Sequence, residues 1–571
     1  MIKLARALAL LGVLLALPFA TFAARGPTGD DIADAVYGQA SFASRSCANP
    51  PTATSACKPA EVAVDGHGNL WVADQGNNRV LMFPRGKAIP TRVVGQFGSF
   101  TTHDCNQKAP ANSYPSSSPA SQYTLCNPGG VAVDAQGTLY ISDTENNRIL
   151  IYRDAAHKPA DMPADAVIGQ PNFHTVSPNT RTAFDVAACP TPSPGHATAC
   201  TLDQPQKIGA SRRGDLVAAD RSNNRVLLWK AATIAAALSH GCTDSCGIAA
   251  DRSWGQYGSM TSTTANNPTP PHPSPRRCSP ITRPSQTNAC ALWLPYATTL
   301  DTAGDLFVAD GQDRVLEYDR ALANGQQAAT LVYGQGGNFT TRVAQPAGPG
   351  SLQGPFYAGV DPRSNVWIAD TGDFRVLEYP PLSSRCASPT LAIRVLGQKA
   401  NVAGHTENAG GMSASALGAA QSIAFDSAGT GYVTDTDNNR VLRFDALATP
   451  FSAAFTGSGT VVTRRAHAGK GTAVKGFLRI TVRASDIVST SGHLRLRAKG
   501  LSRSGTWRGC LVAGQRSIRL RATINGSHDG TVSLKTDPQH GALSATLTGS
   551  ESARIQVAGR VTKVTFAVAG H

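Results

Sequence analysis

The decapeptide ISDTENNRIL, residues 141–150, holds an acid and a base five positions apart. The same pattern occurs six times, as VADQGNNRVL from 72, ISDTENNRIL from 141, AADRSNNRVL from 218, VADGQDRVL from 308, IADTGDFRVL from 368 and VTDTDNNRVL from 433. The acid–base pairs are Asp74 and Arg79, Asp143 and Arg148, Asp220 and Arg225, Asp310 and Arg314, Asp370 and Arg375, and Asp435 and Arg440. The six acids lie 60 to 90 residues apart, which is the spacing of a repeated structural unit.

Each repeat predicts short antiparallel strands joined by tight turns. In EVAVDGHGNLWVAD, residues 61–74, apolar residues alternate on both sides of a turn-forming segment, which is typical of strand, turn and strand. The segment after the acid begins a third strand of β-branched and aromatic residues. A fourth strand ends in Gly-Gln, as in VVGQ from 93, VIGQ from 167, SWGQ from 253, VYGQ from 332 and VLGQ from 395.

Four short strands repeated six times predict an all-β fold, a six-bladed β-propeller. A sixth Gly-Gln strand, AVYGQ at 35–39, precedes the first repeat, whereas the last repeat has none after it. We therefore expect a propeller over 30–450 that is closed by its N-terminal strand. Six near-identical acid–base pairs indicate a structural role, with each pair fixing the turn between the second and third strands.

The stretch GVAVDAQGTLYISDTENNRILIY, residues 130–152, resembles the NHL repeat in its G-x-A-x-D, acid and N-N-R-V positions. The resemblance covers roughly residues 30–450. It implies a six-bladed propeller that serves mostly as a binding platform for protein, RNA or other ligands. A few related propellers are metal-dependent lyases, so the resemblance leaves the choice of function open.

Long polar segments separate each Gly-Gln from the next first strand. These insertions are rich in Pro, Ser, Thr, Asn and Ala, and they span 40–60, 97–129, 171–206, 257–297, 336–357 and 399–421. Antiparallel order places them on the same side of the propeller as the acid-to-base turns. The first four each contain one cysteine pair, and a further pair lies in another loop: Cys47 and Cys57, Cys105 and Cys126, Cys189 and Cys200, Cys278 and Cys290, and Cys242 and Cys246. We expect disulfides rather than metal ligands.

The N-terminus, MIKLARALALLGVLLALPFATFAARG, combines basic residues, a short apolar run and a small-residue cleavage site. It predicts a signal peptide over 1–23 and an exported protein that is periplasmic, attached to the cell surface or extracellular.

The segment 456–571 lacks the repeat and carries the charge of the chain. It holds 18 of the 52 Lys and Arg residues and 4 of the 38 Asp and Glu residues, which leaves 34 of each in the rest. Alternating apolar and polar residues predict a basic β-sandwich-like domain. Its solvent face would bind an anionic envelope surface through Arg479, Arg495, Arg497, Arg519 and Arg521, whereas nucleic acid is a poor fit because stacking aromatics are scarce.

Two classes of function follow. The first is an exported scaffold that recognises a protein or glycan ligand on the disulfide-stapled loop face, and the sequence favours it. The second is an enzyme, a metal-dependent lyase or a lactone hydrolase built on the propeller channel. The sequence indicates no catalytic residues and no cofactor, and its histidines share no register that would form a metal-ligand set. A Ca or Zn ion in the channel is left open.

Overall fold

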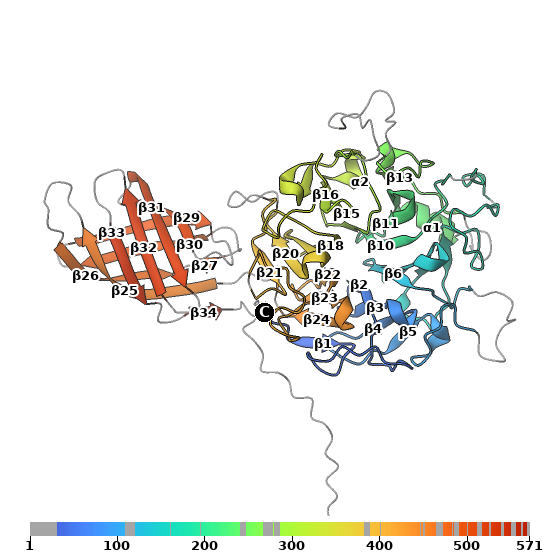
Figure 1. The fold of residues 1–571 in the computed structure, drawn as a ribbon, viewed down its shortest axis with the longest axis horizontal. Helices are drawn as coiled ribbons and strands as arrows, with labels where there is room; N and C mark the ends of the chain where they lie inside the picture. Colours follow the sequence, from blue (N-terminus) through green and yellow to red (C-terminus); the bar gives the residue numbers. More distant parts are fainter. Residues whose placement is uncertain are drawn as a thin grey trace, which may run out of the picture.

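The computed structural model describes residues 31–448, apart from 109–119, 160, 185, 194–195, 240–246, 267–277, 279–285, 382–388, 400 and 446. From 452 onward it describes strand backbone only. Six four-stranded antiparallel sheets follow one another along the chain between Ala35 and Phe444. They are arranged as blades around one axis (Figure 1). The predicted six-bladed propeller is confirmed.

The first three blades each use four consecutive strands. Blade 1 comprises β2 (Pro59–Val64), β3 (Leu70–Asp74), β4 (Arg79–Phe83) and β5 (Arg92–Val94). Blade 2 comprises β6 (Pro128–Val133), β7 (Leu139–Asp143), β8 (Arg148–Tyr152) and β9 (Ala166–Ile168). Blade 3 comprises β10 (Pro205–Ala210), β11 (Leu216–Asp220), β12 (Arg225–Trp229) and β13 (Arg252–Trp254).

The remaining blades repeat this order, except that the last one is completed from the start of the chain. Blade 4 comprises β14 (Ala297–Leu300), β15 (Leu306–Asp310), β16 (Arg314–Tyr318) and β17 (Leu331–Tyr333). Blade 5 comprises β18 (Pro355–Val360), β19 (Val366–Asp370), β20 (Arg375–Tyr379) and β21 (Arg394–Leu396). Blade 6 comprises β22 (Ala420–Phe425), β23 (Gly431–Asp435), β24 (Arg440–Phe444) and β1 (Ala35–Tyr37).

The N-terminal strand closes the ring as predicted. β1 pairs with β24 in antiparallel register, with Ala35 opposite Arg443 and Tyr37 opposite Val441, and the two strands lie side by side in Figure 1. The backbone N–H of Asp34 donates to the carbonyl of Arg443 at 2.7 Å. The first and last parts of the propeller therefore share one sheet.

Short helices occupy the turns and connections. In five blades a 3-10 helix joins the second and third strands, namely η1 (Gln75–Asn77), η3 (Thr144–Asn146), η5 (Arg221–Asn223), η8 (Thr371–Asp373) and η9 (Thr436–Asn438). Four others are η2 (Gln96–Gly98), η4 (Ala155–His157), η6 (Gln256–Gly258) and η7 (Gln335–Gly337). The two α-helices follow third strands, as α1 (Ala231–Ser239) and α2 (Ala321–Asn324). Neither helix in the described part of the chain is long and apolar enough to span a membrane.

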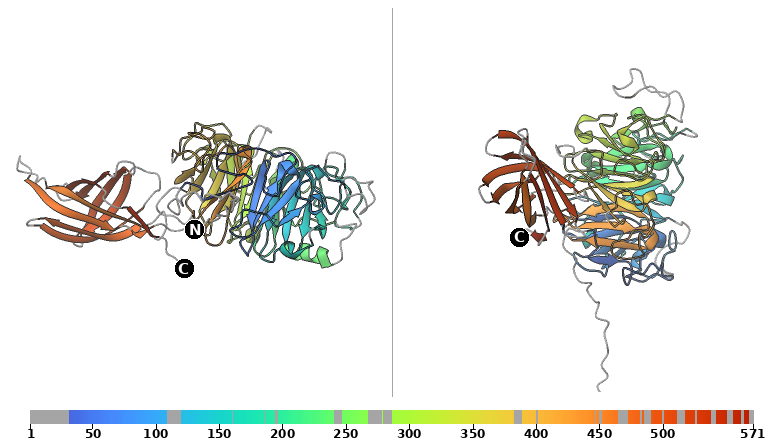
Figure 2. Two further views of the ribbon diagram at one scale, coloured as in Figure 1. Left: turned by 90° about the horizontal axis from the view of Figure 1, so that it is seen from below. Right: turned by 60° about the vertical axis from the view of Figure 1, so that its left-hand side comes forward.

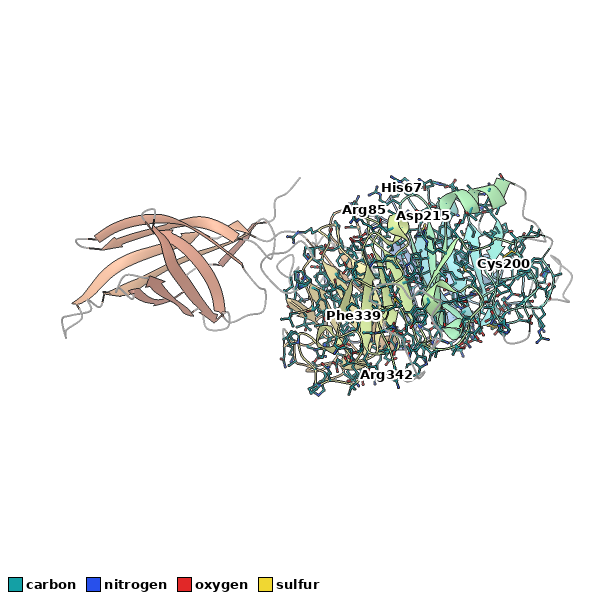
Figure 3. The ribbon with its side chains drawn as sticks, turned by 90° about the horizontal axis from the view of Figure 1, so that it is seen from above. His67, Arg85, Cys200, Asp215, Phe339 and Arg342 are labelled. Carbon is teal, nitrogen blue, oxygen red and sulfur yellow. A yellow bond between two sulfur atoms is a disulfide. The ribbon has the colours of Figure 1, made fainter. Side chains whose placement is uncertain are left out.

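The two faces of the propeller carry different connections. The insertions and the turns between second and third strands share one face, which we call the insertion face. The turns between first and second strands and the connections between third and fourth strands share the opposite face. Seen edge-on, His67, Arg85 and Asp215 lie on one face of the propeller and Arg342 lies on the other (Figure 3). Figure 2 shows the propeller from two further sides.

The core lies between the blades. All five residues of the second strand in every blade are buried. The largest apolar side chains that are fully buried are Trp71, Trp229, Trp254 and Trp367. Because each blade buries its faces against its neighbours, the ring supports the loops on both sides as one scaffold.

The strands after the propeller pair in a single sheet. They are β25 (Ser452–Thr463), β26 (Thr472–Thr481), β27 (Arg483–Ala484), β28 (Thr490–Ala498), β29 (Leu501–Cys510), β30 (Ser517–Ile524), β31 (Ser527–Asp537), β32 (Ala542–Gly549), β33 (Ile555–Arg560) and β34 (Val564–Ala567). Their order is β26-β25-β33-β32-β31-β30-β29-β28-β27, with β34 on β25 and an additional pairing of β26 with β28. Their side chains lie outside the described residues, so the sandwich-like packing of this segment stays a prediction.

Candidate functional site

The six acid–base pairs are buried ion pairs at the insertion face. Nε of Arg148 donates to Oδ2 of Asp143 at 2.7 Å, and both side chains are fully buried. The equivalent contacts span 2.7 to 2.8 Å in the other five blades. Burial raises the pKa of each of the six carboxyls and the partner guanidinium opposes that shift. The cationic partner therefore offsets the cost of burying the carboxylate.

Each pair holds insertions as well as its own turn. Nη2 of Arg148 donates to the carbonyls of Ser121 and Thr124, each at 3.0 Å, and Nη1 donates to the carbonyl of Phe173. Oδ1 of Asp143 accepts the backbone N–H of Cys126 at 2.6 Å. One ion pair thus binds the insertion before its blade and the insertion after it. Our expectation that the pair acts mainly on the turn was too narrow, because most of its backbone partners lie in the insertions.

The glutamine of each Gly-Gln is a second anchor, which the sequence analysis missed. Nε2 of Gln170 donates to the carbonyls of Asn147 and Ser177, both at 2.9 Å. The other five glutamines bind the carbonyl of the equivalent turn residue, as Gln39, Gln96, Gln256, Gln335 and Gln398. This role could have been inferred from the sequence, because glutamine follows glycine at the end of a strand in all six repeats.

The last residue of the acid-to-base turn connects neighbouring blades. Asn147 adopts a left-handed conformation with φ 52°, and its Oδ1 accepts the backbone N–H of Gln204 in the next blade at 2.8 Å. Asn78, Asn224, Asp313 and Asn439 make the equivalent bond. The fourth repeat, one residue shorter, fills this position with Asp313 at φ 55°. Phe374 has no side-chain acceptor, so the junction of blades 5 and 6 lacks this bond.

The recurrent acids at the first turn of each blade organise the backbone of the opposite face. Oδ1 of Asp65 accepts the backbone N–H groups of His67 and Asn69, each at 2.9 Å. Asp134, Asp301, Asp361 and Asp426 repeat this arrangement. In blade 3 the hydroxyl of Ser211 takes the place of the carboxylate. These contacts assign the acids to turns.

Disulfides close four insertions. The bonds join Cys47 to Cys57, Cys105 to Cys126, Cys189 to Cys200, and Cys278 to Cys290, as predicted. Cys242 and Cys246 lie outside the described residues. Four disulfides indicate that the protein matures in an oxidising compartment.

Charged side chains meet at the axis of the propeller. Oε2 of Glu61 in β2 accepts the backbone N–H of Val131 at 2.7 Å and that of Ile208 at 3.4 Å. Glu61 also interacts with the hydroxyl of Tyr357 and with the charge of Lys207. These residues come from the innermost strands of different blades. Their contacts show that side chains fill the axis at this level.

Burial shifts the titration of both charged groups at the axis. It raises the pKa of Glu61 to about 8, against the opposing effect of Lys207. It lowers the pKa of Lys207 to about 8, against the opposing effect of Glu61. Burial therefore favours the neutral form of each group, and the attraction between the two charges opposes this effect.

A row of cations and aromatic rings lies on the insertion face beside the axis. The rings of Tyr296 and Phe356 stack with centroids 4.2 Å apart. The guanidinium of Arg221 lies 5.3 Å from the Tyr296 centroid, and Nζ of Lys207 lies 5.2 Å from the Phe356 centroid. Nζ of Lys207 also donates to Oε1 of Gln421 at 3.3 Å. We call these five residues the axial row.

A second cation–aromatic pair lies on the same face. The guanidinium of Arg342, in the fifth insertion, lies 5.8 Å from the ring centroid of Trp293. Trp293 is held in place by its backbone N–H, which donates to Oδ1 of Asp310 at 2.9 Å. Its side chain is 37% exposed, which is uncommon for a tryptophan. Exposed aromatic groups beside cations are frequent in binding surfaces.

Residues 125–152 match the NHL repeat model. This stretch lies within the six-bladed β-propeller, where it spans the first three strands of blade 2. None of the curated proteins compared with the sequence matches it.

Lyases and a sugar dehydrogenase are among the solved structures to which this propeller is similar. A catalytically inactive virginiamycin B lyase from Staphylococcus aureus with quinupristin has 10% identity and a TM-score of 0.31, over 68% of this chain and 80% of the lyase. A streptogramin B lyase has 8% identity and a TM-score of 0.33, over 70% and 95%. A PQQ-bound aldose sugar dehydrogenase from Streptomyces coelicolor has 14% identity and a TM-score of 0.34, over 69% and 96%.

The described part of the NHL-repeat propeller contains no group of three His, Cys, Asp or Glu side chains that could hold a metal ion. The predicted signal peptide lies outside the described residues. In the C-terminal sheet the register places Arg479 opposite Arg495 and Arg519 opposite Cys510. The side chains of Arg479, Arg495, Arg497, Arg519 and Arg521 are not described, so their anionic partner stays a prediction.

Proposed function

We propose that this NHL-repeat propeller is an exported binding protein whose ligand meets the insertion face. The observation that carries the proposal is the way the insertions are held. Each differs in sequence and length from the others, yet the same arginine contact fixes its backbone in every blade. Varied loops on a uniform rigid support are the usual place for binding residues.

The disulfides and the exposed side chains support the same face. Cross-linked loops lose less conformational freedom when a ligand binds, which favours affinity. The axial row and the Trp293–Arg342 pair provide aromatic and cationic groups there. The signal-like N-terminus and the four disulfides agree with export. The alternative was an enzyme, either a metal-dependent lyase or a lactone hydrolase. In the part of the chain that the structure describes, no contact at the axis specifically favours either class.

Loop replacement tests the proposal, and the contacts set the boundaries. Replacing the whole of 97–129 would remove the carbonyls of Phe100, Ser121 and Thr124, which Arg79 and Arg148 bind. Exchanging 109–119 and 267–277 for Gly-Ser linkers spares these contacts and the cysteines. We expect both exchanged proteins and Trp293→Ala to keep the wild-type melting temperature.

The same proteins are then compared for capture of envelope glycan and protein fractions. The matched control is Arg85→Ala, because Arg85 is exposed on the opposite face. We expect the insertion-face variants to lose the captured component and Arg85→Ala to retain it. Full retention by every folded insertion-face variant would place the site elsewhere.

A further inference from the structure

The axial row presents two cations on either side of a stacked aromatic pair. Arg221 lies against Tyr296 and Lys207 lies against Phe356, while Tyr296 and Phe356 stack on each other. Aromatic faces attract cations electrostatically, so the stack fixes both positive charges in position. Phe356 lies in β18, Lys207 in β10 and Arg221 in the turn η5, while Tyr296 directly precedes β14; all four are at the insertion face.

The two cations keep capacity to bind an anion. An ammonium has three donors, and within the described residues Gln421 accepts one from Lys207 at 3.3 Å. No ion pair joins Arg221 to an acid in the described part of the chain. Arg221, Tyr296, Phe356 and Gln421 are half-buried, whereas Lys207 is 2% exposed. Arg221 is therefore accessible to a ligand, and Lys207 supplies a buried charge against the other ring of the stack.

Glu61, the acid that interacts with Lys207, is itself poorly placed to carry a negative charge. Gly130 allows Glu61 to lie deep between the strands, because a Cβ on Gly130 would approach Oε2 of Glu61 to 2.7 Å. Oε1 of Glu61 has no hydrogen-bond partner and is buried. An ionised carboxylate in such a place would be strongly disfavoured. Burial therefore raises the pKa of Glu61 and favours its neutral form, which weakens it as a counter-charge for Lys207.

Two side-chain amides lie near the cations of the axial row. Gln206 and Gln421 occupy the same position on β10 and β22, the second residue of the innermost strand. Phe356 occupies that position in blade 5, and Tyr296 directly precedes the innermost strand of blade 4. Amides hydrogen-bond to hydroxyl groups, aromatic edges contact apolar carbons, and guanidinium groups bind carboxylates in bidentate fashion. This mixture matches a sugar that carries a carboxylate.

We propose that the axial row, Arg221, Tyr296, Phe356, Lys207 and Gln421, binds a carboxylated sugar unit of an acidic glycan. The inference rests on the proposed function and specifies the ligand of that face. The carboxylate meets Arg221, Lys207 adds positive charge at the other ring of the stack, and the sugar hydroxyls meet the amides of Gln206 and Gln421. An acidic peptide is the competing class of ligand.

Calorimetric titration of the mature full-length protein tests the inference with three probes. These are an oligogalacturonide of uniform length, its fully methyl-esterified form and an oligoglutamate of matched charge. We expect the oligogalacturonide to bind, and esterification to weaken it by at least about tenfold, because the charge-assisted bond is lost. Equal binding of the ester, or equal or tighter binding of oligoglutamate, would overturn the inference.

Variants locate the binding. Arg221→Gln removes one half-buried charge without emptying the core, so we expect it to fold and to weaken oligogalacturonide binding by about tenfold or more. The matched control Arg85→Gln on the opposite face should bind as wild type does. An unchanged affinity of Arg221→Gln would also overturn the inference.

The outcomes separate this inference from the proposed function. If the wild-type protein binds the methyl ester or oligoglutamate and Trp293→Ala loses this binding, the acidic-glycan proposal is refuted. The insertion face then remains the binding site. Oligogalacturonide binding that survives Arg221→Gln and Trp293→Ala but is lost with opposite-face variants refutes both.

Discussion

Arg148 and Asp143 are both fully buried, and Nε of the arginine lies 2.7 Å from Oδ2 of the aspartate. The guanidinium also binds three backbone carbonyls that belong to two insertions. Removing the arginine would leave the buried carboxylate without its cation and would take one donor from each of three backbone carbonyls. The pair therefore couples the stability of the blade to the position of the loops.

We expect Arg148→Leu to lower the free energy of unfolding by about 3–5 kcal/mol, as for other buried pairs that lose one partner. Denaturant titration with intact disulfides measures the change. Arg153→Leu is the control, since its side chain is 60% exposed, and surface changes of this kind stay within about 0.5 kcal/mol. Equal effects of the two substitutions would show that the buried pair adds nothing.

Removal of the closing strand should open the propeller. We expect deletion of 24–40 to expose the edge of β24 and to cause aggregation, because unpaired strand edges associate with one another. Deletion of 24–30 keeps β1 and the bond from Asp34 to Arg443, and this control should remain monodisperse. Size-exclusion chromatography with light scattering compares the two proteins. An unchanged profile and melting temperature after the longer deletion would contradict closure by β1.

We predict that each disulfide joins two cysteines of the same insertion. Non-reducing peptide mapping of exported protein should recover Cys47 with Cys57, Cys105 with Cys126, Cys189 with Cys200, and Cys278 with Cys290. The Cys105→Ser, Cys126→Ser double variant opens a loop with a sequence separation of 21. We expect it to lower the free energy of unfolding by roughly 3 kcal/mol. Free thiols at these positions, or bonds between different insertions, would refute the arrangement.

The pKa of Glu61 predicts how stability depends on pH. Burial raises it from 4.5 to about 8, so the folded protein binds this proton more tightly than the unfolded chain does. The stability contribution is complete below pH 4.5 and is lost as the pH rises through about 8. Glu61→Gln mimics the protonated form, so its free energy of unfolding should decline less over this window than that of wild type.

Glu145→Gln is the control for this pH dependence, because Glu145 is exposed. Its free energy of unfolding should follow the wild-type curve. Parallel curves for wild type and Glu61→Gln would mean that Glu61 does not hold its proton in the folded protein.

The sequence predicted the propeller because its evidence is periodic. Six copies of the Asp-to-Arg segment gave the blade count, and AVYGQ at 35–39 gave the closure. The pairing of cysteines within insertions followed from their spacing.

The axial row was beyond sequence reasoning for a physical reason. Arg221, Tyr296 and Phe356 belong to three consecutive blades and become neighbours only when these blades pack around the axis. Glu61 and Lys207 look like ordinary strand residues until burial shifts their titration. These contacts are made by residues that differ between blades, whereas the repeated pattern contains only residues that the blades share.

Hydrogen–deuterium exchange of the mature full-length protein, with and without saturating oligogalacturonide, tests the insertion-face site most directly. The account predicts protection in peptides that contain Arg221, Trp293 to Tyr296, and Phe356, with no change around His67, Arg85 or Asp215 on the opposite face. Protection confined to the opposite face or to 456–571 would contradict it.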